Sequence, residues 1–259
     1  CIRDREGTDL DKLALSTEKL LAGTDSEITT VGYYCNPIQY AEHRKTLENV
    51  ICTAGKFGAT HVSTFAGAWE GKPVESAYEE FGKVFRELAD LAEEKGVKLG
   101  IENCLMDGTW EHATCNIGFN PKAWEVMFEE VKNDNFGLEW EPTHQMVQLI
   151  DPVTELRKWC KKIVHIHGKD ATIDWDAVRH SGISGAVPFV WHRMPGFGDT
   201  NWRDIISILR SNGYEDDICI EGYHDPVYSG ELEMTGQLHA LNYLKWCRGG
   251  DFTQTPWEK

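Results

Sequence analysis

The sequence predicts an α/β protein whose parallel strands form a (β/α)8 barrel, and three observations support this class. Short apolar segments rich in β-branched residues alternate with longer amphipathic segments along the 259 residues. Short connections between such segments give right-handed βαβ units and therefore a parallel sheet. Polar residues also recur at alternate positions near the ends of several strands, which is typical of strands that point side chains into a barrel.

In the first half of the chain, end signals and residue types define each element. A helix is expected over 7–23, because capping residues precede it and Gly23 follows it. Pro73 can begin a long helix that runs to Lys95, before Gly96. The β-branched and aromatic segments predict strands, and a further amphipathic segment predicts a helix. These strands cover 27–35, 59–67 and 97–103, and that helix covers 41–57.

The second half continues the same alternation up to a longer irregular region. Helices are expected over 121–132, 151–161, 201–213 and 231–247. Strands are expected over 135–142, 162–167 and 217–222, and residues 170–200 are interpreted as a loop-rich insertion. With no repeat, low-complexity tract or linker, residues 1–259 are expected to form a single TIM-barrel domain.

The alternation along the strands predicts which side chains face the helices and which face the barrel interior. The outward set is Leu99, Ile101, Val164, Ile166, Ile218 and Ile220, and the inward set is Gly100, Glu102, His165, His167, Cys219 and Glu221. In each strand, the inward polar residue lies at the carboxyl end, where barrel enzymes place their chemistry.

The number of strands differs from that of a closed barrel. Six strands are predicted, whereas a (β/α)8 barrel has eight. We therefore expect the first two strands and one helix to be missing from the given sequence, which would make the domain N-terminally incomplete. An open doubly wound sheet is the alternative, but no G-x-G-x-x-G motif follows any strand.

Composition limits the classes of partner. The formal net charge of −16 disfavours nucleic acid and anionic membrane surfaces, which attract clustered Lys and Arg. No apolar segment approaches the roughly 18–20 residues that span a bilayer. The eight cysteines include no C-x-x-C pair, so a reduced, cytoplasmic setting is expected.

Four ionisable residues come at the ends of successive strands: Glu102, Glu141, His167 and Glu221. A buried Glu or His at one strand end is usually paired with a neighbour, so each of these residues alone is weak evidence. Three converging carboxylates would repel each other and lose hydration, and a bound cation would resolve both problems. Carboxylate and imidazole ligands without thiolates suit Mn²⁺, Mg²⁺ or Co²⁺.

Four motifs at these positions, and a fifth that lies between the last two of them, resemble those of xylose isomerase-like TIM barrels, the sugar phosphate isomerase/epimerase superfamily that includes ketose 3-epimerases. The motifs are I-E-N (101–103), E-P-T-H (141–144), H-G-K-D (167–170), P-G-F-G (195–198) and I-E-G (220–222). The resemblance covers essentially the whole chain. It is fairly specific for the superfamily and a poor guide to the individual substrate.

The resemblance implies one divalent cation, with Mn²⁺ favoured over Mg²⁺ or Co²⁺. It assigns Glu102, Glu141, His167 and Glu221 as metal ligands. The family usually has Asp where this chain has Glu141, and Glu139 faces the same way, so Glu139 is a rival ligand. The spacing to His144 favours Glu141. His165 is interpreted as a structural or outer-layer residue.

The resemblance also implies roles in catalysis and substrate binding. Glu102 and Glu221 would remove and return a proton next to a carbonyl, as in ketose 3-epimerases. Substrate contacts are expected from His144, Lys169 and Arg193. Asp170 is interpreted either as a cap of the site or as a solvated loop charge. Trp140 and Trp191 are interpreted either as walls for a sugar face or as ordinary core residues.

A sugar isomerase or epimerase that forms an enediolate is the favoured function. The alternative is a lyase or dehydratase of the same superfamily that acts on a keto-sugar, a keto-inositol or a 3-keto C-glycoside. There His144 would be the main base, and the long segment 223–237 favours this reading and a possible partner subunit. An apurinic-site endonuclease is disfavoured by the negative charge, and a non-catalytic metal-binding subunit is a further alternative. The partners expected are a small carbohydrate substrate and further copies of the chain, with no nucleic acid and no membrane.

Overall fold

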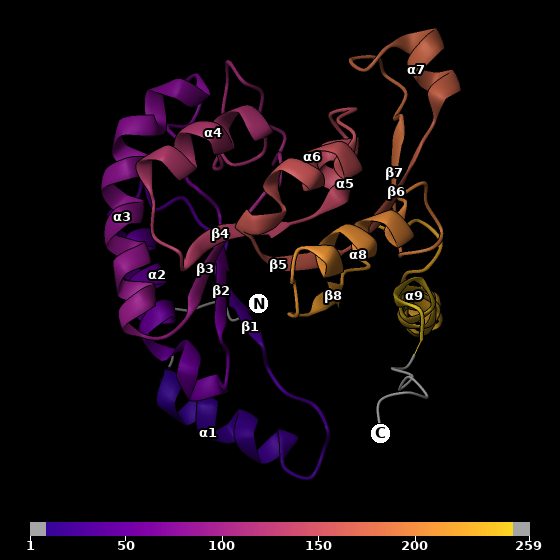
Figure 1. The fold of residues 1–259 in the computed structure, drawn as a ribbon. Coiled ribbons are helices and arrows are strands. Elements are labelled where there is room, and N and C mark those ends of the chain that lie inside the picture. Colours follow the sequence, from indigo (N-terminus) through magenta and orange to yellow (C-terminus); the bar gives the residue numbers. More distant parts are fainter. Residues whose placement is uncertain (1–8, 251–259) are drawn as a thin grey trace. The chain divides into compact units, whose positions relative to one another are not determined.

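The structure is a computed structural model that describes residues 9–250. Its described residues divide into two compact units, and each unit is described separately. The first unit comprises residues 9–144 and 162–166, and the second comprises residues 145–161 and 167–250. Figure 1 labels the helices and strands of both.

The first unit contains a parallel sheet. Its strands are β1 (Thr30–Gly32), β2 (His61–Thr64), β3 (Lys98–Glu102), β4 (Phe136–Trp140) and the start of β5 (Ile163–Gly168). They are hydrogen-bonded in sequence order, and each neighbouring pair is parallel. This order is the one expected from βαβ units. The strand predictions are therefore confirmed in place, although β1, β2, β3 and β4 are shorter than expected.

Helices cover this sheet, and α2 and α3 lie along its outer side (Figure 1). The helical elements are α1 (Leu10–Leu21), α2 (Ala41–Thr53), η1 (Ala54–Phe57), η2 (Val74–Ala77), α3 (Tyr78–Glu94) and α4 (Pro121–Glu130). Phe136 of β4 packs against three aromatic rings, with centroids 6.1, 5.9 and 5.6 Å away; these are Phe81, Phe85 and Phe128. Burial of these rings supplies much of the apolar stabilisation of the unit.

A β-bulge between β4 and β5 sets the direction of the side chains near the site. Leu138 pairs with Ile163 and Glu139 pairs with His165, so Val164 is an extra residue. If Gly100 had a Cβ atom, that atom would lie 3.2 Å from one Val164 methyl group. A Cβ atom on Gly137 would lie 2.5 Å from the other Val164 methyl group. The expectation that Val164 faces outward is therefore wrong, because the bulge interrupts the alternation.

The second unit contains the remaining elements. They are the end of β5, with α5 (Pro142–Met146), α6 (Pro152–Trp159), η3 (Cys160–Lys162), β6 (Asp170–Ile173), α7 (Trp175–Ser181), β7 (Val190–Arg193), α8 (Trp202–Ser211), β8 (Ile218–Ile220), η4 (Gly230–Leu232) and α9 (Glu233–Arg248); α5 and η3 each straddle the boundary between the units. The backbone N–H of Glu221 donates to the Gly168 carbonyl at 3.0 Å, which joins the end of β8 to the end of β5.

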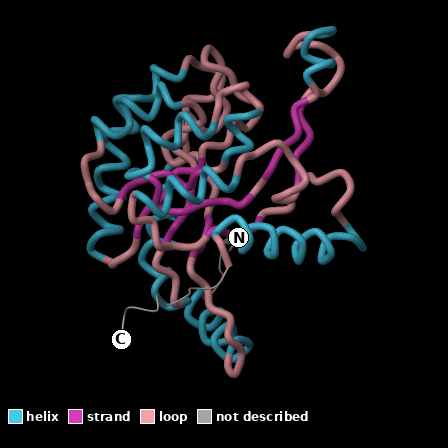
Figure 2. Tube along the Cα trace, turned by 45° about the vertical axis from the view of Figure 1, so that its right-hand side comes forward, coloured by secondary structure: helices cyan, strands magenta, loops and turns pink. Residues whose placement is uncertain are grey.

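The region 170–200 is not the loop-rich insertion that the sequence predicted. β6 and β7 pair antiparallel, from Asp170 with Arg193 to Ile173 with Val190. Figure 2 shows the two strands leading to the small helix α7 at the end of the hairpin. Sixteen residues, 174–189, separate the strands, so the short-turn signal of a hairpin is absent from the sequence.

Helix starts agree with the sequence signals. Five helices carry an Asp or Asn N-cap whose side chain accepts a backbone N–H of the first turn; the caps are Asp9, Asn120, Asp151, Asp174 and Asn201. Within residues 9–250, no helix has the length and apolar character needed to cross a membrane. The seven cysteines of that range are free thiols.

Candidate active site

Three buried carboxylates gather at the ends of β3 and β4 in the first unit. Glu102 is the last residue of β3 and is 7% exposed, whereas Glu139 and Glu141 are fully buried. The strand register places Glu102 beside Glu139 and Glu139 beside His165, so these side chains form one row across the sheet. A parallel sheet brings such residues together at its carboxyl edge, as the strand-end pattern predicts.

Two buried asparagines hold the backbone at these strand ends. The Asn103 side chain accepts the Glu141 N–H at 2.7 Å and donates to the Glu141 carbonyl at 2.9 Å. Asn116 donates to the carbonyls of Glu102 at 2.9 Å and Cys104 at 2.8 Å. The asparagine of the I-E-N motif therefore fixes the backbone of Glu141, and Asn116 fixes the backbone of Glu102.

His144 lies next to Glu141. Its Nε2 is 3.4 Å from Glu141 Oε2, because Pro142 begins the short helix α5 and places His144 one turn later. Burial lowers the pKa of His144. The Glu141 carboxylate and a hydrogen bond with Cys104 outweigh this effect, so the pKa stays well above 6.5. No motif in the sequence indicated that Cys104 would contact this imidazole.

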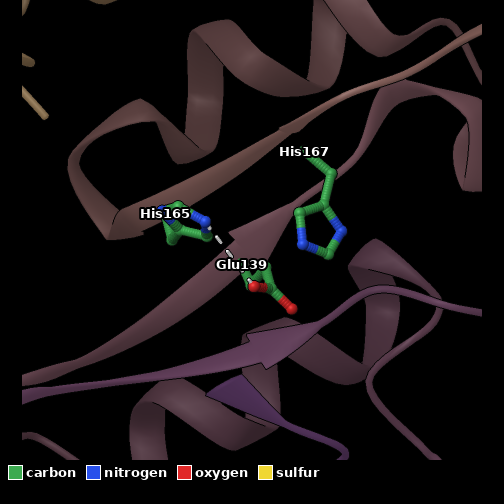
Figure 3. A group of neighbouring side chains, drawn as sticks. All are labelled: Glu139, His165 and His167. Carbon is green, nitrogen blue, oxygen red and sulfur yellow. Dashed lines mark ion pairs between the residues drawn. The ribbon is translucent and has the colours of Figure 1, made fainter. Parts of the chain in front are cut away.

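Glu139 has its own set of contacts inside the first unit. Tyr34 donates its hydroxyl to Glu139 Oε2 at 2.8 Å. His165 Nε2 lies 3.9 Å from Glu139 Oε1, and Figure 3 shows these two side chains directed toward each other. The Thr30 hydroxyl lies 3.4 Å from His165 Nδ1. His165 is thus a buried member of a polar cluster, in agreement with its interpretation as a structural residue.

In the second unit, Glu221 contacts two other predicted site residues. His167 Nδ1 lies 3.1 Å from Glu221 Oε2, and Lys169 Nζ lies 2.7 Å from Glu221 Oε1. Only 3% of the Lys169 side chain is exposed, so this ammonium group is held close to the carboxylate and away from bulk water. The motif H-G-K-D and the motif I-E-G are therefore brought together by the pairing of β5 with β8.

Asp170 is buried and has a structural role. Its carboxylate accepts the backbone N–H groups of Ala171 at 2.8 Å, Gly196 at 3.1 Å and Thr200 at 2.9 Å. Burial raises the pKa of Asp170, and these hydrogen bonds oppose that effect. Asp170 is therefore neither a cap of the site nor a solvated loop charge, because its buried carboxylate holds the backbone in and next to the P-G-F-G loop.

Arg193 is positioned by a carboxylate that the sequence did not single out. Its Nε donates to Asp225 Oδ2 at 3.3 Å, and its guanidinium lies 5.8 Å from the ring centroid of Phe197. Asp225 is 2% exposed and accepts three backbone N–H groups, those of Met194, Val227 and Tyr228. The D-P dipeptide at 225–226 could have indicated this turn-forming aspartate.

Two more imidazoles lie beside Arg193 in the second unit. The rings of His192 and His224 have centroids 5.6 Å apart, and the Tyr223 and His224 rings are 3.8 Å apart. The sequence singled out the segment 223–237, which contains His224, only as a whole, and no motif pointed to His192. Of the tryptophans, Trp140 is fully buried in the core, so it is not a wall for a sugar, whereas Trp191 is 43% exposed.

The predicted metal ligands divide equally between the units. Glu102 and Glu141 belong to the first unit, and His167 and Glu221 belong to the second. The donors are carboxylate oxygens and one imidazole nitrogen, a set that suits a divalent cation of hard or borderline character. Carboxylates as deeply buried as Glu102 and Glu141 are stabilised by nearby positive charge, so the residues present fit a cation.

The sequence of this chain is similar to those of a known family and of known proteins. The family described as xylose isomerase-like TIM barrel matches residues 5–245. An inosose dehydratase of Clostridium tetani is 26% identical over 182 residues, which are 68% of this chain and 57% of that protein. The chain thus spans little more than half the length of that relative.

Two solved structures show the same fold at low identity. The IOLI protein with a bound zinc atom is 19% identical with a TM-score of 0.69, and the match covers 96% of this chain and 84% of the other. A D-psicose 3-epimerase, solved in the presence of D-fructose, is 16% identical with a TM-score of 0.69, and the match covers 94% and 86%. The predicted α/β barrel class is therefore confirmed.

Proposed function

Because the chain belongs to the xylose isomerase-like TIM barrel family, we propose that it removes a proton next to the carbonyl group of a polyhydroxylated ketone and then eliminates water. The substrate class is a keto-inositol or a related keto-sugar. Support for elimination comes from the inosose dehydratases among the curated relatives. This moves the preference from epimerisation, which the sequence favoured, to the dehydratase alternative.

The single observation that carries the proposal is the pairing of an imidazole with a carboxylate at the strand ends of each unit. His144 lies 3.4 Å from Glu141, and His167 lies 3.1 Å from Glu221. A carboxylate beside an imidazole orients the ring and stabilises its protonated form. Such a group can accept a proton from carbon and hold it during the reaction.

Glu102, Glu141, His167 and Glu221 are the proposed ligands of one divalent cation. When bound, the cation would acidify the carbon next to the carbonyl and stabilise the negative charge that develops on oxygen. Glu141 is preferred to Glu139, because Glu139 is already engaged by Tyr34 and His165. Mn²⁺ remains the preferred ion of this proposal, with Mg²⁺ and Co²⁺ as alternatives.

The remaining residues have proposed roles in proton transfer and substrate binding. His144 takes the proton from carbon, and the Glu141 carboxylate stabilises the imidazolium that results. Lys169 donates to Glu221 and keeps that carboxylate oriented. Arg193, fixed by Asp225, holds substrate oxygens with its outer N–H groups.

Epimerisation is the second candidate, and the presence of two acidic residues supports it. Glu102 and Glu221 both lie at carboxyl ends of strands, and a 3-epimerase needs one base to remove the proton and another acid to return it. In that reaction, the hydroxyl groups of the substrate all remain in the product.

Solvent deuterium exchange distinguishes the candidates. The chain is incubated with a keto-inositol or with a ketohexose in D₂O, with Mn²⁺, Co²⁺ or Zn²⁺ added, and the products are analysed by NMR. An absorbing enone supports the dehydratase, with or without deuterium in the recovered substrate, because the carbon next to the carbonyl keeps no hydrogen in the product. Deuterium with an inverted alcohol supports the epimerase. The Glu221→Gln variant is the control. Absence of both exchange and enone in the unchanged chain, despite bound metal, would refute the proposed chemistry.

A further inference from the structure

His224 occupies a backbone position that ordinarily belongs to glycine. The Asp225 N–H donates to the Gly222 carbonyl at 3.2 Å, which closes a four-residue turn. His224 is the third residue of this turn and has φ of 72°, whereas Tyr223 has no positive φ. This is the pattern of a type II turn, in which Gly or Asn is favoured at the third position. A histidine here is a non-glycine residue held at positive φ, and residues held in sparsely populated backbone regions cluster at functional sites.

The turn that contains His224 is held against the end of β7 within the second unit. The Asp225 carboxylate accepts the Met194 N–H at 2.7 Å and the Arg193 Nε at 3.3 Å. A Cβ built on Gly222 would overlap the Met194 side chain. The turn therefore packs closely against β7, and the segment cannot relax to a more favourable backbone without losing these contacts.

His224 follows closely after a residue of the candidate site and has two ring neighbours. The turn begins directly after Glu221, which contacts His167 and Lys169. The His224 ring is exposed, lies 3.8 Å from the Tyr223 ring and is 5.6 Å from the half-buried His192 ring. His192 in turn precedes Arg193 on β7. An imidazole with such support is oriented but open to a ligand.

We propose that His224, oriented by His192 and Tyr223, is the acid that protonates the departing hydroxyl group in the elimination. This inference rests on the proposed dehydratase function and adds a catalytic residue to it. The base of the proposed dehydratase removes the proton from the carbon next to the carbonyl, and the electrons of that C–H bond form a C=C bond. The C–O bond on the adjacent carbon breaks, and its oxygen takes the proton of His224 and leaves as water. His224 is left neutral and regains a proton from solvent.

The experiment separates proton removal from loss of water. A keto-inositol is incubated with the metal-loaded chain in D₂O, and deuterium incorporation and enone formation are followed in parallel. The variants are His224→Asn and His224→Gly, which both suit the turn, and His192→Gln. His180→Asn, a change of an exposed histidine on α7, is the matched control. A substrate analogue with fluorine in place of the departing hydroxyl group is tested as well, because fluoride leaves without a proton.

The expected result is a loss of enone formation by about 10²–10⁴-fold in both His224 variants, with deuterium incorporation retained and the melting temperature unchanged or raised. His192→Gln is expected to lose less, and the fluoro analogue should restore the rate. Enone formation within about threefold of the unchanged chain in both His224 variants would overturn the proposal, as would equal losses of exchange and enone formation. Epimerisation without an enone overturns it too, and a lack of both exchange and enone formation in the unchanged chain overturns the proposed function together with it.

Discussion

Asp225→Asn is expected to destabilise the second unit strongly, because the carboxylate holds four hydrogen-bond donors. Oδ2 accepts the N–H of Met194 and the Nε of Arg193, at 2.7 and 3.3 Å. Oδ1 accepts the N–H groups of Val227 and Tyr228, both at 2.8 Å. Asparagine keeps only one acceptor oxygen, so one of these pairs would face an NH₂ group instead.

The magnitude follows from the two hydrogen bonds that are lost. Each bond to a charged acceptor contributes about 1.5–3 kcal/mol, and Asp225 is only 2% exposed. Taking the lower value, the free energy of unfolding falls by about 3 kcal/mol. For a chain of this size the melting temperature falls by roughly 6–12 °C, since 1 kcal/mol corresponds to about 2–4 °C.

The effect has a defined pH dependence. Burial raises the pKa of Asp225, but three backbone N–H groups and Arg193 outweigh this and hold it below its usual value. A lowered pKa in the folded state means that the stabilisation is present above the unfolded pKa of about 3.9. It is lost as pH falls through the folded pKa. The difference between the two proteins should therefore be constant from about pH 5 to 8 and shrink below about pH 4.

Calorimetry and urea unfolding measure this difference. Asp176→Asn is the matched control, because its side chain is 96% exposed and pairs only with Arg179 at the surface; its stability should stay within about 0.5 kcal/mol. If Asp225→Asn lowered the melting temperature by less than about 2 °C, the carboxylate would not hold the turn as described.

Three further outcomes are expected. Gly137→Ala should lower the free energy of unfolding, measured by urea unfolding, by about 1–3 kcal/mol, because the added Cβ atom has no room. Gly55→Ala is the control and should change it little, because a Cβ atom there meets no atom within 4 Å. Equal effects of the two changes would contradict the packing described. The ring signals of His144 in NMR should titrate well above pH 6.5, and Glu141→Gln should lower that midpoint. The stability that this imidazolium contributes is present below about pH 6.5 and is lost as pH rises through the pKa of His144 in the folded state. A titration midpoint of His144 that stays unchanged in Glu141→Gln would rule out the pairing of these two residues. Equilibrium dialysis should find about one Mn²⁺ per chain, bound at least about tenfold more weakly by Glu102→Gln, and equal binding would remove that residue from the ligand set.

The positions of the proposed ligands could be predicted from the sequence because they depend on local patterns. Glu102 ends β3, His167 lies near the end of β5 and Glu221 follows β8. The period of two along a strand decides which side chains share a face, and within each unit the parallel strands have their carboxyl ends at one edge. The choice between Glu139 and Glu141 could not be made in this way, since both face the same side.

Other features were missed because they depend on contacts between distant segments. Asp225 interacts with Met194 and Arg193, more than 30 residues away in the chain. The bulge at Val164 arises from the register between two strands, and no residue in it carries a bulge signal. The antiparallel pairing of β6 with β7 likewise spans a helix and long loops, so only the folded chain reveals it.

The sequence by itself determined the α/β class, the order of the parallel strands and of the helices between them, and the four strand-end motifs, because periodicity, helix caps and short connections are local properties. The tertiary structure alone decided which carboxylates are engaged by neighbours: Glu139 by Tyr34 and His165, Asp170 by the P-G-F-G loop, and Asp225 by β7. It also revealed His224 in the glycine position of a turn. The physical reason is that burial and hydrogen bonding depend on which segments meet in space, and only folding brings those segments together.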